Sequence, residues 1–319
     1  MKLFLKKIFT FSIISTCILI LVAILKIHVE PFEEFSKLKK ALNGNTDVIN
    51  FGSSVDFHAA ESDIDKRSIS QMLDSNLIDY KVEGISGPAY HAEIFVEFVR
   101  YISNTDYSSV IAIPINLRSL APSWDIKPEY QFIKERHELR GIPYFTNILG
   151  FREFSQFDLE NQIVYHMDEK YKNVKDVYVT YRKADLKTKR TNGFILNYMQ
   201  PISKGHIKLQ AFQNIISFCN ANDIELILYI PPIDYSTAQK LNIEGFTELV
   251  SKNINNIKTT LTSDQSYLID MSMSLDSTYF DWEIDEVPNE HLNAEGRQFV
   301  ADALSKCFLT NFDSSSTTD

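Results

Sequence analysis

Three cysteines in 319 residues are too few for a disulfide framework, and no pair of them has the CxxC spacing of a zinc ribbon. Cys17 lies in a long apolar run. Cys219 and Cys307 lie in predicted amphipathic helices, where a buried free thiol is the usual state. We therefore predict no disulfides and no metal site.

Glycine is also scarce, and the ten glycines form neither GxGxxG nor GxxxxGK[ST]. The main fingerprints of nucleotide-binding loops are thus missing, and we expect no cofactor. Basic residues are outnumbered, 32 against 42 acidic ones, for a net charge of −10. An acidic surplus argues against nucleic acid as a partner, because such binding depends on clustered positive charge.

Apolar residues are plentiful, at 44% of the chain, and they are concentrated at the N-terminus. Residues 8–25, IFTFSIISTCILILVAIL, carry no charge and have the length of a transmembrane helix. Lys2, Lys6 and Lys7 precede this run, and such a bias places the N-terminus in the cytoplasm. We therefore predict a signal-anchor within residues 1–27, with membrane contact through residues 8–27 and the main domain periplasmic or extracellular.

Two other interpretations of this run are disfavoured. A cleaved signal peptide has a shorter apolar stretch and a small-residue cleavage site, which KIHVEPFEEF does not provide. A lipoprotein signal ends at its cysteine, whereas Cys17 is followed by ILILVAIL.

After a connection over residues 28–44, apolar strands alternate with amphipathic helices over residues 45–310. Strands that are apolar throughout and separated by helices indicate a parallel sheet covered on both faces. We predict an α/β fold, a three-layer doubly wound parallel sheet. The predicted strands cover residues 47–52, 80–85, 109–116, 224–231 and 267–272; the predicted helices cover residues 64–77, 88–102, 206–222, 244–260 and 294–307.

Residues 117–200 interrupt this alternation after the third strand, and we interpret them as an insertion that could cover the site. The insertion is locally basic, which suits a solvated surface or contact with an anionic polymer or membrane surface. Residues 311–319 form a low-complexity tail that we expect to be disordered. The basic residues of the insertion are Lys170, Lys172, Lys175, Arg182, Lys183, Lys187, Lys189 and Arg190.

Polar residues follow three of the predicted strands, at the edge where doubly wound sheets bind ligands. FGSSVD places Ser53 and Ser54 after the first strand, where a serine at a helix N-terminus is a candidate nucleophile. Gly87 in GISGPAY and Asn116 in IPINLRS follow the second and third strands. A backbone N–H and a side-chain amide are the donors that an oxyanion hole requires.

His291 lies in PNEHLNAEGR, in a loop immediately before the last predicted helix. A base for a serine on the first strand would occupy this position. Another histidine, His58, lies one helical turn after Ser54.

Together these residues resemble the four blocks of the SGNH (GDSL-type) hydrolase family. The resemblance covers residues 45–116 and 220–307 and implies a flavodoxin-like sheet. It implies that Ser54 is the nucleophile, that His291 is the base, and that Gly87 and Asn116 are oxyanion donors. In particular, the chain is similar to the membrane-anchored branch that acylates cell-surface polymers, such as the teichoic-acid D-alanyl transfer protein and the alginate O-acetylation proteins.

The sequence departs from the family pattern in two blocks. The acid that usually lies three residues before the base falls on Pro288, and the third block reads PIN in place of Gly-x-Asn. The site then either uses a neighbouring acid or works as a Ser–His dyad, since the acid only orients the imidazole and stabilises its charged form. The nearby acids are Asp281, Glu283, Asp285, Glu286 and Glu290, of which Glu290 and Asp285 are our candidates.

The resemblance implies a membrane-anchored esterase or O-acyltransferase that acts on ester groups of an envelope polysaccharide or glycolipid. The alternative is a catalytically degenerate relative that binds a membrane acyltransferase or a polysaccharide.

Overall fold

The structure is a computed structural model, and the chain forms two compact units, Met1–Glu33 and Glu34–Asp319. The residues that it describes are 2–24, 31–107, 109–122, 124, 131–141, 185–263, 266–281 and 289–312.

The first unit contains helix α1, Lys2–Ile24, which includes most of the uncharged run. Within the described ranges, no helix combines the length and the apolar character needed to cross a membrane. The predicted transmembrane helix over residues 8–27 is therefore not found. Helix α1 ends at Ile24, and residues 25–27 lie outside the described residues.

The second unit is built on a five-stranded parallel sheet in the order β2-β1-β3-β4-β5. The chain winds from β1 outward to β2, then returns past β1 to β3 and continues in the opposite direction. The structure thus confirms the predicted α/β class and parallel sheet. The reversal of direction creates a switch point beside the carboxyl end of β1. The strands are β1 (Val48–Gly52), β2 (Val82–Ser86), β3 (Val110–Pro114), β4 (Glu225–Ile230) and β5 (Ser266–Asp270).

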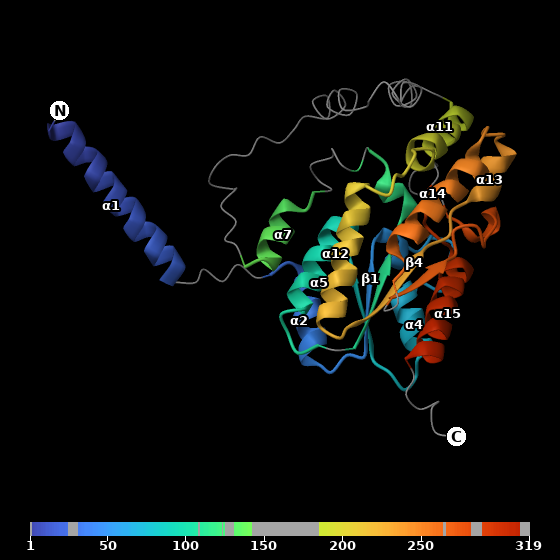
Figure 1. Ribbon diagram of the computed structural model, residues 1–319, viewed down its shortest axis with the longest axis horizontal. Helices are drawn as coiled ribbons and strands as arrows, with labels where there is room; N and C mark the ends of the chain where they lie inside the picture. Colours follow the sequence, from blue (N-terminus) through green and yellow to red (C-terminus); the bar gives the residue numbers. More distant parts are fainter. Residues whose placement is uncertain are drawn as a thin grey trace. The chain divides into compact units, whose positions relative to one another are not determined.

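Helices cover both faces of the sheet (Figure 1). Helices α4 (Ile69–Asn76) and α15 (Ala294–Asn311) pack together on one face. On the other face α12 (Ile207–Ala221) packs against α5 (Ala92–Ile102) and α14 (Phe246–Leu261). The remaining helices of the second unit include α2 (Glu33–Asn43), α7 (Ile133–Leu139), α11 (Leu186–Tyr198), α13 (Tyr235–Lys240), η1 (Leu117–Leu120) and η5 (Ser277–Tyr279).

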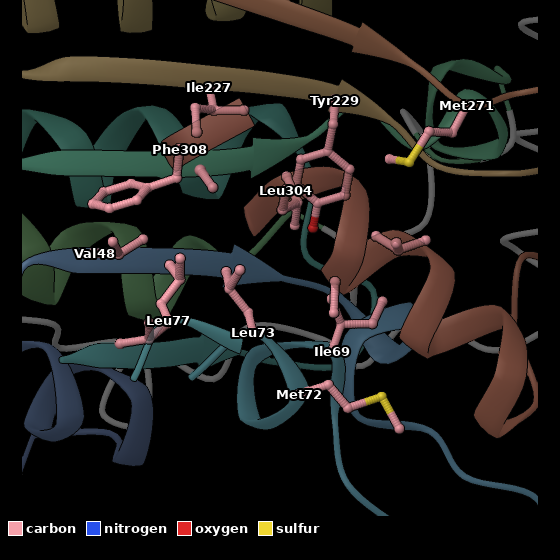
Figure 2. Packing of buried hydrophobic residues seen from close by; sticks show 14 of the residues in the cluster. Val48, Ile69, Met72, Leu73, Leu77, Ile227, Tyr229, Met271, Leu304 and Phe308 are labelled. Carbon is pink, nitrogen blue, oxygen red and sulfur yellow. The ribbon is translucent and has the colours of Figure 1, made fainter. Parts of the chain in front are cut away.

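The core has two halves because successive strand residues point to opposite faces of the sheet. Val48 and Tyr229 face α4 and α15, where they join Leu73, Leu304 and Phe308 in one buried cluster (Figure 2). On the other face Phe51 packs against Phe95 and Phe98 of α5, with ring centroids 6.0 and 5.3 Å apart. Because helices cover both faces of the sheet, the polar residues that follow the strands lie at its carboxyl edge.

The helix predicted over residues 64–77 begins later than expected, at Ile69. Ser68 and Gln71 form a capping box, in which each side chain accepts a hydrogen bond from the other residue's backbone N–H. Ile64, which we placed on the apolar side of the helix, lies in the preceding loop with a fully exposed side chain. The capping box therefore determines the start of the helix.

The described parts of the predicted insertion include η1, α7 and α11. Helix α11 is anchored to α14, because the Phe194 ring packs edge-on against Phe246 with centroids 5.5 Å apart. Lys187, Lys189 and Arg190 of the basic cluster lie on α11. The other basic residues that we listed fall outside the described residues, as do residues 313–319 of the predicted tail.

Candidate active site

Ser54 lies at the carboxyl edge of the sheet, two residues after the end of β1. It is the first residue of the short helix α3, Ser54–Phe57, and Ser53 is the N-cap. The turn between β1 and α3 is tight, because a Cβ on Gly52 would lie 2.4 Å from the Ser86 hydroxyl oxygen and 2.5 Å from the Asp56 Cβ. Only glycine fits there, and this close approach holds Ser54 at the edge.

The buried carboxylate of Asp56 fixes the position of α3 through hydrogen bonds to neighbouring elements. Asp56 Oδ1 accepts hydrogen bonds from the Ser70 backbone N–H at 2.9 Å and hydroxyl at 2.8 Å, and Oδ2 accepts from the Ser86 hydroxyl at 2.7 Å. The Asn50 side-chain amide donates at 3.3 Å. Burial raises the pKa of Asp56, and the hydrogen bonds from Ser86 and Ser70 act in the opposite direction. The network connects α3 to β1, β2 and α4, and we did not predict it.

His291 meets Ser54 at this edge, with its Nε2 3.0 Å from the Ser54 hydroxyl oxygen. Local hydrogen bonds set the position of the histidine: the Asn289 side-chain oxygen accepts from the His291 backbone N–H at 2.9 Å. Two residues later, Asn293 caps α15 by accepting from the Gly296 N–H at 3.0 Å. The structure thus brings together two residues that are 237 positions apart.

The His291 ring is buried, and burial is the first cause that lowers its pKa to about 3. The nearby charges of Arg118 and His58 lower this pKa further. The ring is therefore neutral near pH 7, and Nε2 can accept the Ser54 proton. Within the part of the chain that the structure describes, Nδ1 has no hydrogen-bond partner.

The candidate acid Glu290 does not contact His291 Nδ1. Its Oε1 accepts from the Arg118 backbone N–H at 3.1 Å, and this bond turns the carboxylate toward the start of η1. Burial raises the pKa of Glu290, while the charge and the N–H of Arg118 oppose that shift. In this structure Glu290 therefore does not form the hydrogen bond to His291 Nδ1 that the acid of such a site would form. Asp285, the other candidate, lies outside the described residues.

A different acid lies close to the base. Asp281 Oδ2 accepts a hydrogen bond from His58 Nε2 at 2.8 Å, and the His58 ring stacks on the His291 ring with centroids 4.3 Å apart. We noted His58 one turn after Ser54 and Asp281 among the nearby acids, but we did not predict this pair. The spacing of His58 from Ser54 was the only signal for it.

Asn116 and Ser53 lie next to Ser54 and contact one another. The Asn116 side-chain amide donates to the Ser53 hydroxyl oxygen at 2.8 Å, and both side chains are buried. The same oxygen accepts from the Val55 backbone N–H at 3.3 Å. Ser53 therefore holds the amide of the predicted oxyanion donor beside the nucleophile.

Gly87 lies on the neighbouring strand end, and its backbone N–H donates to the Gly52 carbonyl oxygen at 3.4 Å. This is a long hydrogen bond, directed back toward β1. The Tyr90 ring covers Gly87 so closely that a Cβ there would lie 2.4 Å from the ring. Both proposed donors thus lie at the edge that carries Ser54.

The four residues of the resemblance lie beside the switch point, where the Ser54 hydroxyl oxygen is within hydrogen-bond distance of the His291 ring and Gly87 and Asn116 are close by. Such an arrangement can attack an acyl carbonyl. No group of three His, Cys, Asp or Glu residues that could hold a metal is found among the described residues. The absence of a metal and of a cofactor stays a prediction.

Comparison with known proteins gives no match to a family model and no match among curated proteins. Solved structures do match. A carbohydrate esterase family 3 structure from Talaromyces cellulolyticus is 9% identical over 83% of this chain and 97% of its own, with a TM-score of 0.39. A catalytic mutant of an acetylxylan esterase from Geobacillus stearothermophilus is 10% identical over 82% and 93%, with a TM-score of 0.40. A likeness of this size does not assign an activity.

Proposed function

We propose that the protein is an SGNH-type serine esterase or O-acyltransferase. The observation that carries the proposal is the 3.0 Å separation between the Ser54 hydroxyl oxygen and His291 Nε2. A nucleophile within hydrogen-bond reach of a neutral imidazole is the signature of covalent acyl transfer. The position of the pair, beside the switch point of a doubly wound sheet, is where such folds bind ligands.

The reaction has two halves. His291 Nε2 takes the proton of the Ser54 hydroxyl as its oxygen attacks the ester carbonyl carbon, and a tetrahedral oxyanion forms. The protonated His291 then gives that proton to the leaving alcohol oxygen, which leaves the acyl group on Ser54. In the second half water or a sugar hydroxyl attacks the acyl-enzyme, His291 takes its proton, and Ser54 recovers it on release.

Three donors lie at the edge where the oxyanion forms: the backbone N–H of Ser54, the backbone N–H of Gly87 and the side-chain amide of Asn116. Preorganised donors of this kind stabilise developing charge in a site that excludes water. Ser53 holds the Asn116 amide in the resting protein.

As substrate we propose the ester groups of an envelope polysaccharide or glycolipid. The support is the resemblance to the acyl-modifying branch of the family, which implies a main domain outside the cytoplasm. Three basic residues on α11 belong to the stretch that we associate with an anionic polymer. Protease protection in intact cells checks the location, since a cytoplasmic domain would stay protected until the cells are lysed.

A second candidate function is a non-catalytic partner that binds a membrane acyltransferase or polysaccharide. The observation that favours it is the state of the base: His291 has a pKa lowered to about 3, and its Nδ1 has no partner within the described residues. An imidazole with these properties is a weak base. This candidate predicts that Ser54→Ala and His291→Ala leave biological function intact.

The test of the enzymatic proposal is covalent labelling of the full-length protein with a serine-reactive fluorophosphonate. We expect one adduct, on the peptide that contains Ser53 and Ser54, and none in Ser54→Ala. The matched control is Ser75→Ala, because Ser75 is an exposed serine on α4 whose hydroxyl donates to the Gln71 carbonyl oxygen of the same helix. Folding of each variant is checked by its thermal unfolding midpoint.

The outcomes separate the two candidates. Labelling of Ser54, with hydrolysis of p-nitrophenyl acetate that disappears in Ser54→Ala and His291→Ala, supports the enzyme. Folded wild-type protein that takes no label and hydrolyses no ester would refute it. An acetylated polysaccharide then distinguishes the two activities: an esterase releases acetate from it, whereas an acyltransferase transfers the acetyl group to a sugar acceptor.

A further inference from the structure

We propose that His58 and Asp281 form a positioning pair that holds the His291 ring toward Ser54. The pair takes the place of the carboxylate that the resemblance leads one to expect at Pro288. This inference rests on the proposed function, since it assigns a role relative to the same nucleophile and base.

The first observation is a closed ring of hydrogen bonds through four residues. The Ser54 hydroxyl donates to His291 Nε2 at 3.0 Å, and the Asp281 backbone N–H donates to the His291 carbonyl oxygen at 3.0 Å. The Asp281 carboxylate then accepts from His58 Nε2 at 2.8 Å, and the His58 backbone N–H donates to the Ser54 carbonyl oxygen at 2.8 Å. The ring connects nucleophile and base through a path separate from their own contact.

The second observation is ring stacking. The imidazoles of His58 and His291 lie 4.3 Å apart at an interplanar angle of 27°. A ring packed against one face of His291 opposes rotation of that side chain away from Ser54. The contact matters more because, within the described ranges, Nδ1 of His291 accepts or donates no hydrogen bond that would fix the ring plane.

The third observation is burial of the pair. The side chains of His58 and Asp281 are 15% and 7% exposed, so their hydrogen bond is shielded from water. A shielded, charge-assisted hydrogen bond holds its geometry better than one at the surface. The Arg297 guanidinium adds a further constraint, because its Nη1 donates to the His58 carbonyl oxygen at 3.1 Å.

The polar and charged groups around His291 determine how the His58–Asp281 pair affects the pKa of its ring. The groups that act on the ring are the Ser54 hydroxyl, the positive charge of Arg118 and the imidazole of His58, with Asp281 behind His58. The charge of His58 contributes to the low pKa of His291. Replacement of His58 by an uncharged ring removes this contribution.

The test uses variants that separate the stacking from the hydrogen bond. His58→Phe keeps a ring face and loses the bond to Asp281, whereas His58→Ala loses both. Asp281→Asn keeps an acceptor for His58 and loses the charge, whereas Asp281→Ala loses both. His137→Phe on α7 is the matched histidine control. Each is measured as the rate of fluorophosphonate labelling at Ser54 per folded molecule, and by ¹⁵N-histidine NMR titration of His291.

We expect the labelling rate to fall roughly 100-fold in His58→Ala, because displacement of a reacting group by about 1 Å has a cost of that order. His58→Phe and Asp281→Asn should each recover part of that loss, and KM for p-nitrophenyl acetate should stay within about twofold while kcat falls. In His58→Ala the NMR resonances of the His291 ring should shift, because the ring loses the stacked imidazole. His137→Phe should match the wild type.

Wild-type labelling rates in both His58→Ala and Asp281→Ala would overturn the inference. If His58→Ala does not fold, His58→Phe and Asp281→Asn decide, and wild-type rates in both would overturn it equally. If wild-type Ser54 takes no label, the proposed function has failed. The inference is then judged by NMR alone, and His291 ring resonances that keep their wild-type positions in both His58→Ala and Asp281→Ala would refute it.

Discussion

Arg297 forms an ion pair with Asp63 in which its Nη1 lies 2.8 Å from Oδ2, and the Arg297 side chain is completely buried. The same nitrogen donates to the carbonyl oxygen of Leu292, the residue after the base, at 2.8 Å. It also donates to the carbonyl oxygen of His58. One guanidinium on α15 thus joins the loop after α3 to the loop that carries His291. Its other nitrogens donate to the carbonyl oxygens of Arg67 and Asp65.

Arg297→Met should therefore destabilise the fold strongly. Removal of Arg297 leaves the Asp63 carboxylate without its ion-pair partner and several carbonyl oxygens without the guanidinium donor, and breaking a buried ion pair costs about 3–5 kcal/mol. Urea unfolding measures the loss. Arg297→Lys keeps the charge but cannot form the fork of bonds, so it should fall between Met and wild type. Equal stability of all three proteins would contradict this role.

Asn116→Ala should reduce kcat about 10²- to 10³-fold, because it removes one oxyanion donor from the proposed site. Ser53→Ala should reduce kcat less, since the Asn116 amide remains and loses only the hydroxyl that holds it. Steady-state hydrolysis of p-nitrophenyl acetate measures both. If Ser53→Ala were the more damaging change, Ser53 and not Ser54 would be the candidate nucleophile.

The low pKa of His291, about 3, predicts an unusual pH profile. A base with an ordinary histidine pKa loses half of its activity near pH 6.5. Here the ring stays neutral well below that value, so phosphonate labelling at Ser54 should stay level as the pH falls from 8 to about 5. A half-maximal rate near pH 6.5 in fully folded protein would show that the ring titrates normally.

The same pKa makes a prediction about stability. Between pH 6.5 and about 3 the unfolded chain protonates His291 and the folded protein does not, so the unfolded state binds more protons. The contribution of the neutral His291 ring to the free energy of unfolding is therefore fully present above pH 6.5 and declines as the pH falls below that value. Urea unfolding at a series of pH values, for wild type and His291→Gln, should show a shallower acid decline in the variant.

Gly87→Ala should destabilise the protein by about 1–3 kcal/mol, the range for an overpacked site. The added Cβ would lie 2.4 Å from the Tyr90 ring, which is itself buried against Phe98 and Phe132. The control is Gly205→Ala, where nothing lies within 4 Å. A second change, Tyr90→Leu, should recover part of the loss in Gly87→Ala, and additive losses would rule out the clash.

The parts of the fold that were predictable from sequence are those with a local pattern. The mostly apolar strands β1, β3 and β4 lie within two residues of the predicted bounds, and the periodic helices α5 and α12 lie within four, since burial leaves a strong signal. The start of α4 was wrong because Ser68 and Gln71 form a capping box that outweighs the apolar Ile64. Residues that form a capping box are harder to recognise in a sequence than a period of apolar residues.

The site divides in the same way. Ser54, Asn116 and His291 could be proposed because each follows a strand or precedes a helix at one edge of the sheet. The pairing of His58 with Asp281 spans 223 positions and depends on where two loops meet, so no local pattern reveals it. The same holds for Arg297, a charged residue in an amphipathic helix. Its complete burial is explained only by the two loops whose carbonyl oxygens it binds. Single polar residues that act across loops are what sequence patterns miss.

The hydrogen bond between Asn116 and Ser53 uses one of the two N–H groups of the Asn116 amide and so fixes the plane in which the other lies. In the proposed reaction this second N–H would meet the carbonyl oxygen without first having to find its orientation. The tetrahedral oxyanion would accept a charge-assisted bond of roughly twice the strength of the one that a ground-state ester carbonyl accepts. The gain from a donor fixed in advance would thus fall on the transition state and favour turnover over tight substrate binding.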